Sequence, residues 1–268
     1  MSIYGVTDIM QFDLKGRKGL IVGIANEHSL AWSAAQCFYD AGADLAVTYL
    51  NDKAKPYVAP LAAQVAASIV MPCDVAKAGQ LDSVFEAIEK EWGHLDFLLH
   101  AVAWARKEDL HGRLTDCSSD GFVESMLVSC HSFIQMAKHA EPLMKEGGSL
   151  MTLSYYGAEK VVDHYNVMGP VKAALEASVR YLAHELGRSA IRVNAISAGA
   201  VATRAASGIE HFDELLNETV RKAPLRRTVQ SDEVGGAALM LASDLSSAIT
   251  GEVIHVDAGF HVEGMVFH

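Results

Sequence analysis

The sequence has no excess of basic residues and no cysteine or histidine motif. Its formal net charge of -11 argues against a surface for nucleic acid or anionic lipid, since both require basic patches. The twelve histidines show no HxxxH or His/Cys spacing, so no metal site is expected. The cysteines form no CxxC pair, and we interpret them as reduced thiols of a cytoplasmic protein. They are Cys37, Cys73, Cys117 and Cys130.

Long apolar runs are also missing. The N-terminus lacks the charged region and apolar core of a signal peptide, and no apolar stretch reaches the length of a membrane span. The sequence therefore predicts a soluble protein. Hydrophobic residues make up 50% of the chain and aromatic residues only 7%. This balance suits a parallel sheet that helices cover on both faces.

Short aliphatic runs alternate with amphipathic segments along the whole chain. The alternation predicts a Rossmann-type α/β fold: a doubly wound parallel sheet of about seven strands with flanking helices. No linker divides it, so we expect one domain over residues 1–268, with the small-residue stretch Ser197–Lys222 as a substrate flap. The predicted strands are Gly19–Gly23, Asp44–Tyr49, Ala67–Pro72, Leu95–Ala101, Ser149–Leu153, Arg192–Ile196 and Val253–Val256, and the predicted helices are Leu30–Asp40, Asp52–Ala66, Gln80–Glu91, Gly121–Lys145, Val171–Leu186 and Ser231–Ala242.

The turn after the first predicted strand is a candidate cofactor site, although it lacks the GxGxxG fingerprint. Gly23 permits a tight turn and Ser29 can bond a phosphate at a helix N-terminus, or they merely end a strand and cap a helix. Asp74 is placed to accept from an adenine amino group with Val75 beside the ring, or to cap the next helix. The residues Val102–Ala105 permit a cofactor to pass close by, or simply pack tightly.

Tyr165 and Lys172 form the most informative pattern. Seven residues are nearly two helical turns, so both side chains are expected on one face of a helix, with a rise of roughly 10 Å between their Cα atoms. A lysine ammonium near a phenol favours the phenolate and can hold a nicotinamide ribose. This spacing also occurs by chance on amphipathic helices, but here it follows the fifth strand of a Rossmann-like chain.

With these residues the chain resembles the bacterial enoyl-acyl-carrier-protein reductases, a divergent branch of the short-chain dehydrogenase/reductase superfamily. That branch carries Tyr-x6-Lys, as Tyr165 and Lys172 do, where most of the superfamily carries Tyr-x3-Lys. The resemblance extends over nearly the whole chain. Its other matching segments are Thr48-Tyr49, Asn51-Asp52-Lys53, Cys73-Asp74-Val75, Asn194-Ala195-Ile196-Ser197-Ala198-Gly199, Ala205-Ala206-Ser207-Gly208-Ile209, Arg226-Arg227-Thr228 and Gly251-Glu252-Val253.

The resemblance implies an enzyme that reduces a trans-2-enoyl thioester of acyl carrier protein with hydride from NADH during fatty acid elongation. Tyr165 would hydrogen-bond the thioester carbonyl, Lys172 would bind the nicotinamide ribose, and Tyr155 would line the same pocket as a second candidate proton donor or acceptor. The implied cofactor positions are Gly23, Ser29, Leu30, Asp74, Val75, Val102, Lys172, Val201, Ala202, Thr203, Arg204 and Ala205. The implied substrate positions are Ala105, Tyr155, Tyr165, Met168, Ala205, Ala206, Ile209 and Phe212.

The chain departs from the family pattern at several positions. Ala101 and Ala103 replace a serine and a glycine after the fourth strand, Ala200 replaces a proline, and Arg204 lies where the family is apolar. Pro170 cannot sit inside a helix, so we expect the helix with Lys172 to start close to Gly169, with the proline in its first turn.

Two other functions are open from sequence alone. A carbonyl-reducing dehydrogenase of the superfamily would need a Tyr-x3-Lys pattern, and Ser154, eleven residues before Tyr165, does not match its serine. A non-catalytic dinucleotide-binding protein would explain Leu50, Ala101 and Ala103.

Two further expectations concern the cofactor and the assembly. The segment Tyr49-Leu50-Asn51-Asp52 has no arginine nearby for a ribose 2′-phosphate, so we expect NADH rather than NADPH. The predicted helices Gly121–Lys145 and Val171–Leu186 carry broad apolar faces that suit pairing across two-fold axes. Because the resembled family also assembles as tetramers, we expect a homotetramer.

Overall fold

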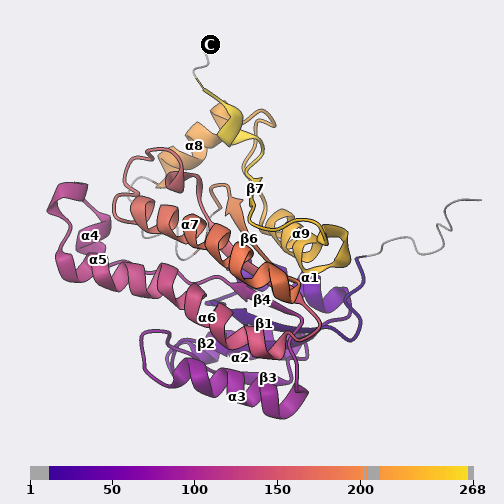
Figure 1. The fold of residues 1–268 in the computed structure, drawn as a ribbon. Coiled ribbons are helices and arrows are strands. Elements are labelled where there is room, and N and C mark those ends of the chain that lie inside the picture. Colours follow the sequence, from indigo (N-terminus) through magenta and orange to yellow (C-terminus); the bar gives the residue numbers. More distant parts are fainter. Residues whose placement is uncertain (1–11, 202, 204–211, 265–268) are drawn as a thin grey trace, which may run out of the picture.

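Seven parallel strands form one sheet in the order β3-β2-β1-β4-β5-β6-β7 (Figure 1). The computed structural model describes residues 12–201, 203 and 212–264. The chain winds outward from β1 in one direction and, from β4 onward, in the other, which confirms the predicted doubly wound fold. Ligands of such sheets bind where the order reverses. The strands are β1 (Lys18–Val22), β2 (Asp44–Tyr49), β3 (Ile69–Pro72), β4 (Phe97–His100), β5 (Gly148–Ser154), β6 (Ile191–Ala198) and β7 (Val253–Val256).

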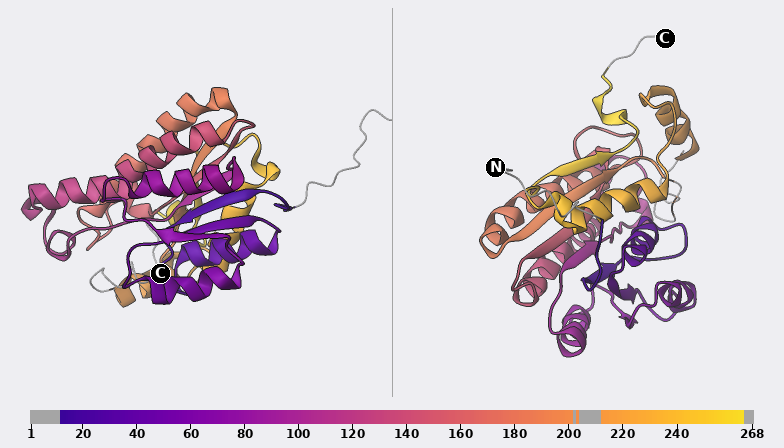
Figure 2. Two further views of the ribbon diagram at one scale, coloured as in Figure 1. Left: turned by 90° about the horizontal axis from the view of Figure 1, so that it is seen from below. Right: turned by 90° about the vertical axis from the view of Figure 1, so that its right-hand side faces the viewer.

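Helices cover both faces of the sheet (Figure 2). Because successive strand residues point to opposite faces, Ile21 and Leu99 pack into one hydrophobic layer while Leu20 and Leu98 pack into the other. One layer contains α1 (Leu30–Asp40), α2 (Lys55–Gln64) and α9 (Ser231–Ala242), and the other contains α3 (Gln80–Trp92), α6 (Ser132–Ala140) and α7 (Met168–Leu186). The remaining α-helices of the described residues are α4 (Lys107–Leu110), α5 (Ser119–Met126) and α8 (Phe212–Lys222).

The predicted strands are confirmed to within one or two residues at each end, and the helices Leu30–Asp40 and Ser231–Ala242 are confirmed as predicted. The predicted helix Asp52–Ala66 is too long at both ends. Before it, the side-chain oxygen of Asn51 accepts hydrogen bonds from the N–H groups of the third and fourth residues of the turn, which holds that turn outside the helix. After it, Ala66 has a φ of 46°.

The predicted helix Gly121–Lys145 is not continuous. A π-helical turn over Leu127–His131 separates α5 from α6. Directly after this turn, the hydroxyl of Ser132, the first residue of α6, donates to the Val128 carbonyl at 2.7 Å, a side-chain bond of the kind that bends helices. Such turns often mark functional sites, and this one reaches the candidate site described below.

The predicted flap Ser197–Lys222 is only partly irregular. β6 continues through Ser197, because it pairs along its length with β5 and β7. The segment Phe212–Lys222 forms α8, with acidic residues in its first turn and basic residues in its last, as the helix dipole favours. Residues 202 and 204–211 lie outside the described residues. In the ranges that the structure describes, no helix combines the length and apolar character needed to cross a bilayer.

Two adjacent glycines of α9 should respond in opposite ways to alanine. A Cβ at Gly235 would lie 2.9 Å from the Cys37 sulfur and 3.0 Å from the Ser33 carbonyl oxygen of α1, whereas a Cβ at Gly236 meets no atom within 4 Å. We expect Gly235→Ala to lower the free energy of unfolding by about 1–3 kcal/mol through overpacking. Gly236→Ala should raise it by up to about 1 kcal/mol. Urea denaturation of both variants checks this, and a similar change in both would contradict it.

Candidate active site

A cavity of about 390 Å³ lies beyond the carboxyl ends of the central strands, where the sheet order reverses. Its size is within the range of small-molecule sites. Its walls come from the turn after β1, the loop after β4, the end of β5, the start of α7 and the segments on either side of residues 204–211. The sequence-predicted residues that line it are Gly23, Ser29, Leu30, Val102, Ala105, Tyr155, Tyr165, Met168, Lys172, Val201, Thr203 and Phe212.

Asp74 and Val75 do not line this cavity. The Asp74 carboxylate accepts from the Ala76 N–H at 3.1 Å and pairs with Lys77 at 3.4 Å. Because Gly79 occupies the N-cap position of α3, the alternative that Asp74 caps this helix is wrong. The remaining predicted positions are outside the described residues: Ala202, Arg204, Ala205, Ala206 and Ile209.

Gly23 lets the chain after β1 pass close to the chain after β4. Its φ is 120°, and a Cβ there would lie 2.2 Å from the Ala101 carbonyl oxygen, so no other residue fits without moving the backbone. Gly23 therefore does more than end a strand, which was the alternative from the sequence: it also permits this close approach beside the cavity.

Ser29 holds the turn after β1 in shape. Its hydroxyl oxygen accepts from the N–H groups of Ala25 and Asn26 at 3.0 Å each and makes no side-chain cap on α1. The interpretation of Ser29 as a helix cap is therefore confirmed for its position, which is the N-cap of α1, but not for its side chain. Leu30 and Ala31 line the cavity from the first turn of α1, where backbone N–H groups lack intrahelical acceptors and favour an anion.

Tyr165 does not share a helix with Lys172, contrary to the prediction from their spacing. α7 begins at Met168, because Pro170 is tolerated only in the first helical turn. The predicted helix start near Gly169 is thereby confirmed, and Tyr165 lies in the turn before it.

This turn has an unusual backbone. His164 and Asn166, on either side of Tyr165, have φ angles of 64° and 35°, and the Asn166 side chain donates to the Leu110 carbonyl at 2.6 Å. The ring of Tyr165 packs over Gly157, where a Cβ would lie 2.3 Å from a ring carbon. The tyrosine is thus fixed by a turn and a glycine rather than by a helical face.

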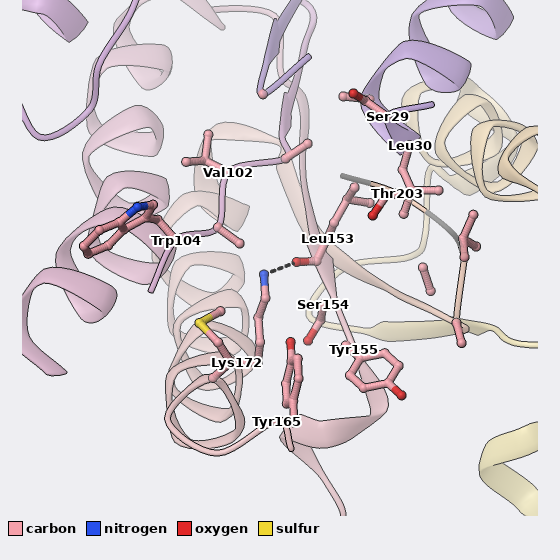
Figure 3. Close-up of a pocket in the computed structure, with 18 of the residues that line it drawn as sticks. Ser29, Leu30, Val102, Trp104, Leu153, Ser154, Tyr155, Tyr165, Lys172 and Thr203 are labelled. Carbon is pink, nitrogen blue, oxygen red and sulfur yellow. Dashed lines mark hydrogen bonds between the residues drawn. The ribbon is translucent and has the colours of Figure 1, made fainter. Parts of the chain in front are cut away.

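The two tyrosines differ in direction. Their rings meet edge-on, with centroids 4.9 Å apart and planes inclined by 64°. Figure 3 shows the Tyr165 hydroxyl pointing toward Ser154 and the Lys172 side chain, whereas the Tyr155 hydroxyl points away from them. Tyr165 is therefore the better placed to meet a reacting oxygen beside Lys172.

Both phenols are neutral at physiological pH. Burial raises the pKa of Tyr155 to about 12. Burial also raises the pKa of Tyr165, and Tyr155 and the Glu176 carboxylate raise it further. The expectation that Lys172 favours a phenolate is therefore wrong, since desolvation of the charged phenol prevails. Tyr165 instead offers an O–H donor.

Lys172 is buried beneath the cavity. Its ammonium donates to the Leu153 carbonyl at 2.7 Å (Figure 3), which leaves two N–H donors. Burial lowers its pKa to about 8, while Cys130 and Glu176 oppose that change. The free N–H groups of α1, the close approach at Gly23 and this ammonium together fit a dinucleotide with a pyrophosphate and a ribose.

His100 lies buried at the end of β4. Because its ring is neutral, it adds no second positive charge near Lys172. Ser132 already donates its proton to the Val128 carbonyl, so His100 Nε2–H must donate to the Ser132 oxygen at 2.9 Å. His100 Nδ1 then accepts from the Thr152 hydroxyl at 2.8 Å. Burial, with Lys172 as a second cause, lowers the pKa of His100 to about 3, so the ring is neutral.

The loop after β4 is fastened to the π-helical turn. The buried Ser129 hydroxyl accepts from the Trp104 N–H at 2.9 Å and donates to the Trp104 carbonyl at 3.1 Å. Arg106 forms an ion pair with Glu124 of α5. These contacts fix the part of the loop that lines the cavity, including the departure from the family pattern at Ala103.

Ser154 and Glu176 are site residues that the sequence analysis did not identify. Both are buried, and the Ser154 hydroxyl donates to Glu176 Oε1 at 2.5 Å. Ser154 lines the cavity. One sequence signal was available: Glu176 follows Lys172 by four residues, which places an acid on the same buried face of α7 as the lysine.

Comparison with known proteins gives consistent matches over nearly the whole chain. The family described as Enoyl-(Acyl carrier protein) reductase matches residues 23–261. The chain is 51% identical to enoyl-acyl-carrier-protein reductase (NADH) 1 of Rhizobium meliloti (strain 1021), across 94% of this chain and 93% of that protein.

Two solved structures are similar in fold and sequence. The enoyl-acyl-carrier-protein reductase of Anaplasma phagocytophilum, solved in complex with NAD, is 54% identical with a TM-score of 0.91, covering 94% of this chain and 96% of that chain. The reductase of Bacillus cereus, solved with NADP+ and indole naphthyridinone, is 44% identical with a TM-score of 0.92, covering 94% of this chain and 99% of that chain.

Proposed function

The chain belongs to the enoyl-acyl-carrier-protein reductase family, and from this premise we propose that Tyr165, Ser154 and Lys172 form the centre at which an enoyl thioester is reduced. The enzyme is an NADH-dependent enoyl-acyl-carrier-protein reductase of fatty acid elongation. NADH, when bound, supplies the hydride. One observation supports this centre most strongly: a neutral tyrosine hydroxyl and a buried ammonium lie together in a largely apolar cavity.

Tyr165 acts on the substrate oxygen. As negative charge develops on the thioester carbonyl, a preorganised O–H donor stabilises it, and such electrostatic stabilisation is usually the largest protein contribution. The Tyr165 hydroxyl has the direction that this task requires (Figure 3). Tyr155, whose hydroxyl points elsewhere, shapes the pocket beside it.

Lys172 orients the cofactor. Two of its ammonium protons are available once the Leu153 carbonyl has taken the third, and hydroxyl groups of a ribose are suitable acceptors. Gly23 and the first turn of α1 hold the pyrophosphate. Met168 and Phe212, which both line the cavity, supply apolar contacts for an acyl chain.

The proposed centre is tested by following NADH absorbance with crotonyl and longer trans-2-enoyl thioesters. We expect turnover with enoyl thioesters, and none with ketones or aldehydes, because the neutral O–H donor of Tyr165 would stabilise the enolate that conjugate addition of a hydride forms. Turnover with carbonyl compounds alone would support the carbonyl-reducing alternative, and binding of NADH without any turnover would support the non-catalytic one.

NADH should give a higher kcat/KM than NADPH. At the end of β2 the exposed Leu50 offers no charge to a 2′-phosphate, and Lys55 lies over the Tyr49 ring at 5.8 Å. Steady-state kinetics with both cofactors checks this. Leu50→Arg should raise kcat/KM for NADPH more than for NADH, since a guanidinium pairs well with phosphate. A wild-type preference for NADPH would overturn the prediction.

We also propose that the chain is one domain that assembles as a cytoplasmic homotetramer. Apolar side chains are exposed on neighbouring helices: Phe122, Val123 and Leu127 on α5 and the π-helical turn, and Tyr181 on α7. Such faces suit isologous pairing. All four cysteines are free thiols, which suits a reducing compartment.

Light scattering should give about four times the 28.8 kDa mass of one chain. Val123→Glu should lower that mass, because it places a charge in the apolar face. Val161→Glu, at a residue that is 96% exposed, should leave it unchanged. A wild-type mass of one chain would contradict the tetramer.

A further inference from the structure

Glu176 is a buried acid that the proposed roles of Tyr165 and Lys172 leave unexplained. Only 6% of its surface is exposed, although ionised carboxylates are costly to bury. Its bond to the Ser154 hydroxyl connects it to the cavity that Ser154 lines. Burial raises its pKa, and the charge of Glu159 acts in the same direction.

Titratable groups continue from Glu176 to the surface. His255 of β7 and Glu159 both influence its charge, and His255 Nε2 lies 2.8 Å from Glu159 Oε1. The Glu159 side chain is 38% exposed and that of His255 16%. His255 stacks on His261 with centroids 3.9 Å apart, and His261 pairs with Asp257 at 2.9 Å. The charge of the buried acid is therefore coupled to side chains that reach the surface.

The reaction needs such a route. Addition of a hydride to the double bond leaves an electron pair on the substrate, and this pair must take up one proton that comes from water. The cavity is largely apolar, however, and both tyrosines are buried or nearly so. A tyrosine that gives up its proton must recover one before the next turnover. Figure 3 shows the Tyr165 hydroxyl pointing toward Ser154, and the Ser154 hydroxyl in turn bonds Glu176.

We propose that Glu176 supplies the proton for enoyl reduction, through the Ser154 hydroxyl, from the surface group formed by Glu159 and His255. After hydride addition the electron pair resides on the thioester oxygen as an enolate. Tyr165 gives its proton to that oxygen. The Ser154 hydroxyl, which donates to Glu176 before the reaction, then turns to give its proton to the Tyr165 oxygen and takes the proton of the Glu176 carboxyl. Glu176 then takes a proton from water at the surface group. Transfer of the enol proton to the α-carbon completes the acyl thioester.

The charges around Glu176 come from several elements. Lys172 and Arg180 lie one turn away on α7, and Ser154 belongs to β5. The charges of Glu159 and His255 also act on Glu176. Lys172 favours the ionised carboxylate that remains after proton transfer, and Glu159 favours the protonated one. Glu176 is therefore set between two charges of opposite sign, as a group that alternates between two protonation states requires.

Glu176→Gln tests the proposal, because the amide still accepts a bond from Ser154 but cannot give up a proton. This inference rests on the proposed reductase activity, so wild-type turnover with crotonyl thioester is established first; its absence would defeat the activity and not the proton route. With an active wild type, we expect Glu176→Gln to lower kcat at least tenfold while the Kd of NADH, measured by fluorescence, changes less than twofold. The matched control Glu185→Gln alters an exposed glutamate of the same helix and should leave kcat unchanged.

Isotope effects separate proton supply from a structural role. In Glu176→Gln the solvent deuterium effect on kcat should increase, and the effect of deuterated NADH should shrink toward one, because proton delivery becomes the slow step. Ser154→Ala provides a second route to the same test, and the double variant should lose no more activity than the worse single variant. Unchanged isotope effects, or losses that multiply in the double variant, would overturn the proposal.

Discussion

Tyr165→Phe should lower kcat at least tenfold, with little change in the KM of the enoyl thioester. The hydroxyl stabilises charge that exists only in the transition state, so its loss reduces kcat and kcat/KM together. A tenfold loss corresponds to about 1.4 kcal/mol. Because phenylalanine fills the same space over Gly157, the melting temperature should remain close to that of the wild type. Stopped-flow and steady-state kinetics with crotonyl thioester measure the effect.

Tyr155→Phe is the matched comparison. Its hydroxyl points away from Ser154 and Lys172 (Figure 3), so the variant should raise KM more than it lowers kcat. If Tyr155→Phe lost turnover while Tyr165→Phe kept it, the two roles would have to be exchanged. If neither variant lost turnover, the tyrosine-based mechanism itself would be wrong.

Lys172→Ala should raise the Kd of NADH and lower kcat, each by roughly tenfold or more, or about 1.4 kcal/mol per effect. The variant removes the ammonium that is expected to hold the ribose, and it leaves the Leu153 carbonyl without the partner seen at 2.7 Å. Fluorescence titration with NADH measures binding independently of turnover.

Two further variants show whether charge or volume is responsible. Lys172→Met keeps most of the buried stem and removes only the charge, so it should share the loss of NADH affinity while disturbing the fold less. Lys90→Ala removes an exposed lysine from α3, on a helix that does not line the cavity, and should change neither constant. Wild-type affinity in Lys172→Met would contradict a role for the ammonium.

The sequence by itself determined the layered fold and the start of the helix that carries Lys172. A sheet buried on both faces needs continuous aliphatic strands, and these appear in the sequence as runs such as Leu20–Val22 and Leu98–Leu99. Pro170 can occupy only the first turn of a helix, which is a local constraint. The family pattern also directed attention to Tyr155, Tyr165 and Lys172, which the structure brings to one cavity.

Local patterns were less reliable where side chains compete with the backbone. The predicted helix Asp52–Ala66 starts later than expected because Asn51 holds the turn before it. The predicted helix Gly121–Lys145 is interrupted by a π-helical turn, next to which Ser132 bonds to the backbone. Ser29 had a pattern typical of a helix cap, but its hydroxyl holds the preceding turn instead. In each case the hydrogen bonds of one side chain decided between two conformations that the sequence allowed.

Only the tertiary structure decided which groups meet around the cavity. The protonation of Tyr165 depends on burial and on the nearby Tyr155 and Glu176, and the burial follows from how the elements pack. Ser154 and Glu176 are 22 residues apart, and Glu159 and His255 are 96 residues apart. They become neighbours because β5, β6 and β7 lie side by side and α7 packs against the sheet beneath them. Sequence periodicity describes which face of an element is buried, whereas contacts between elements depend on the order in which the strands pair.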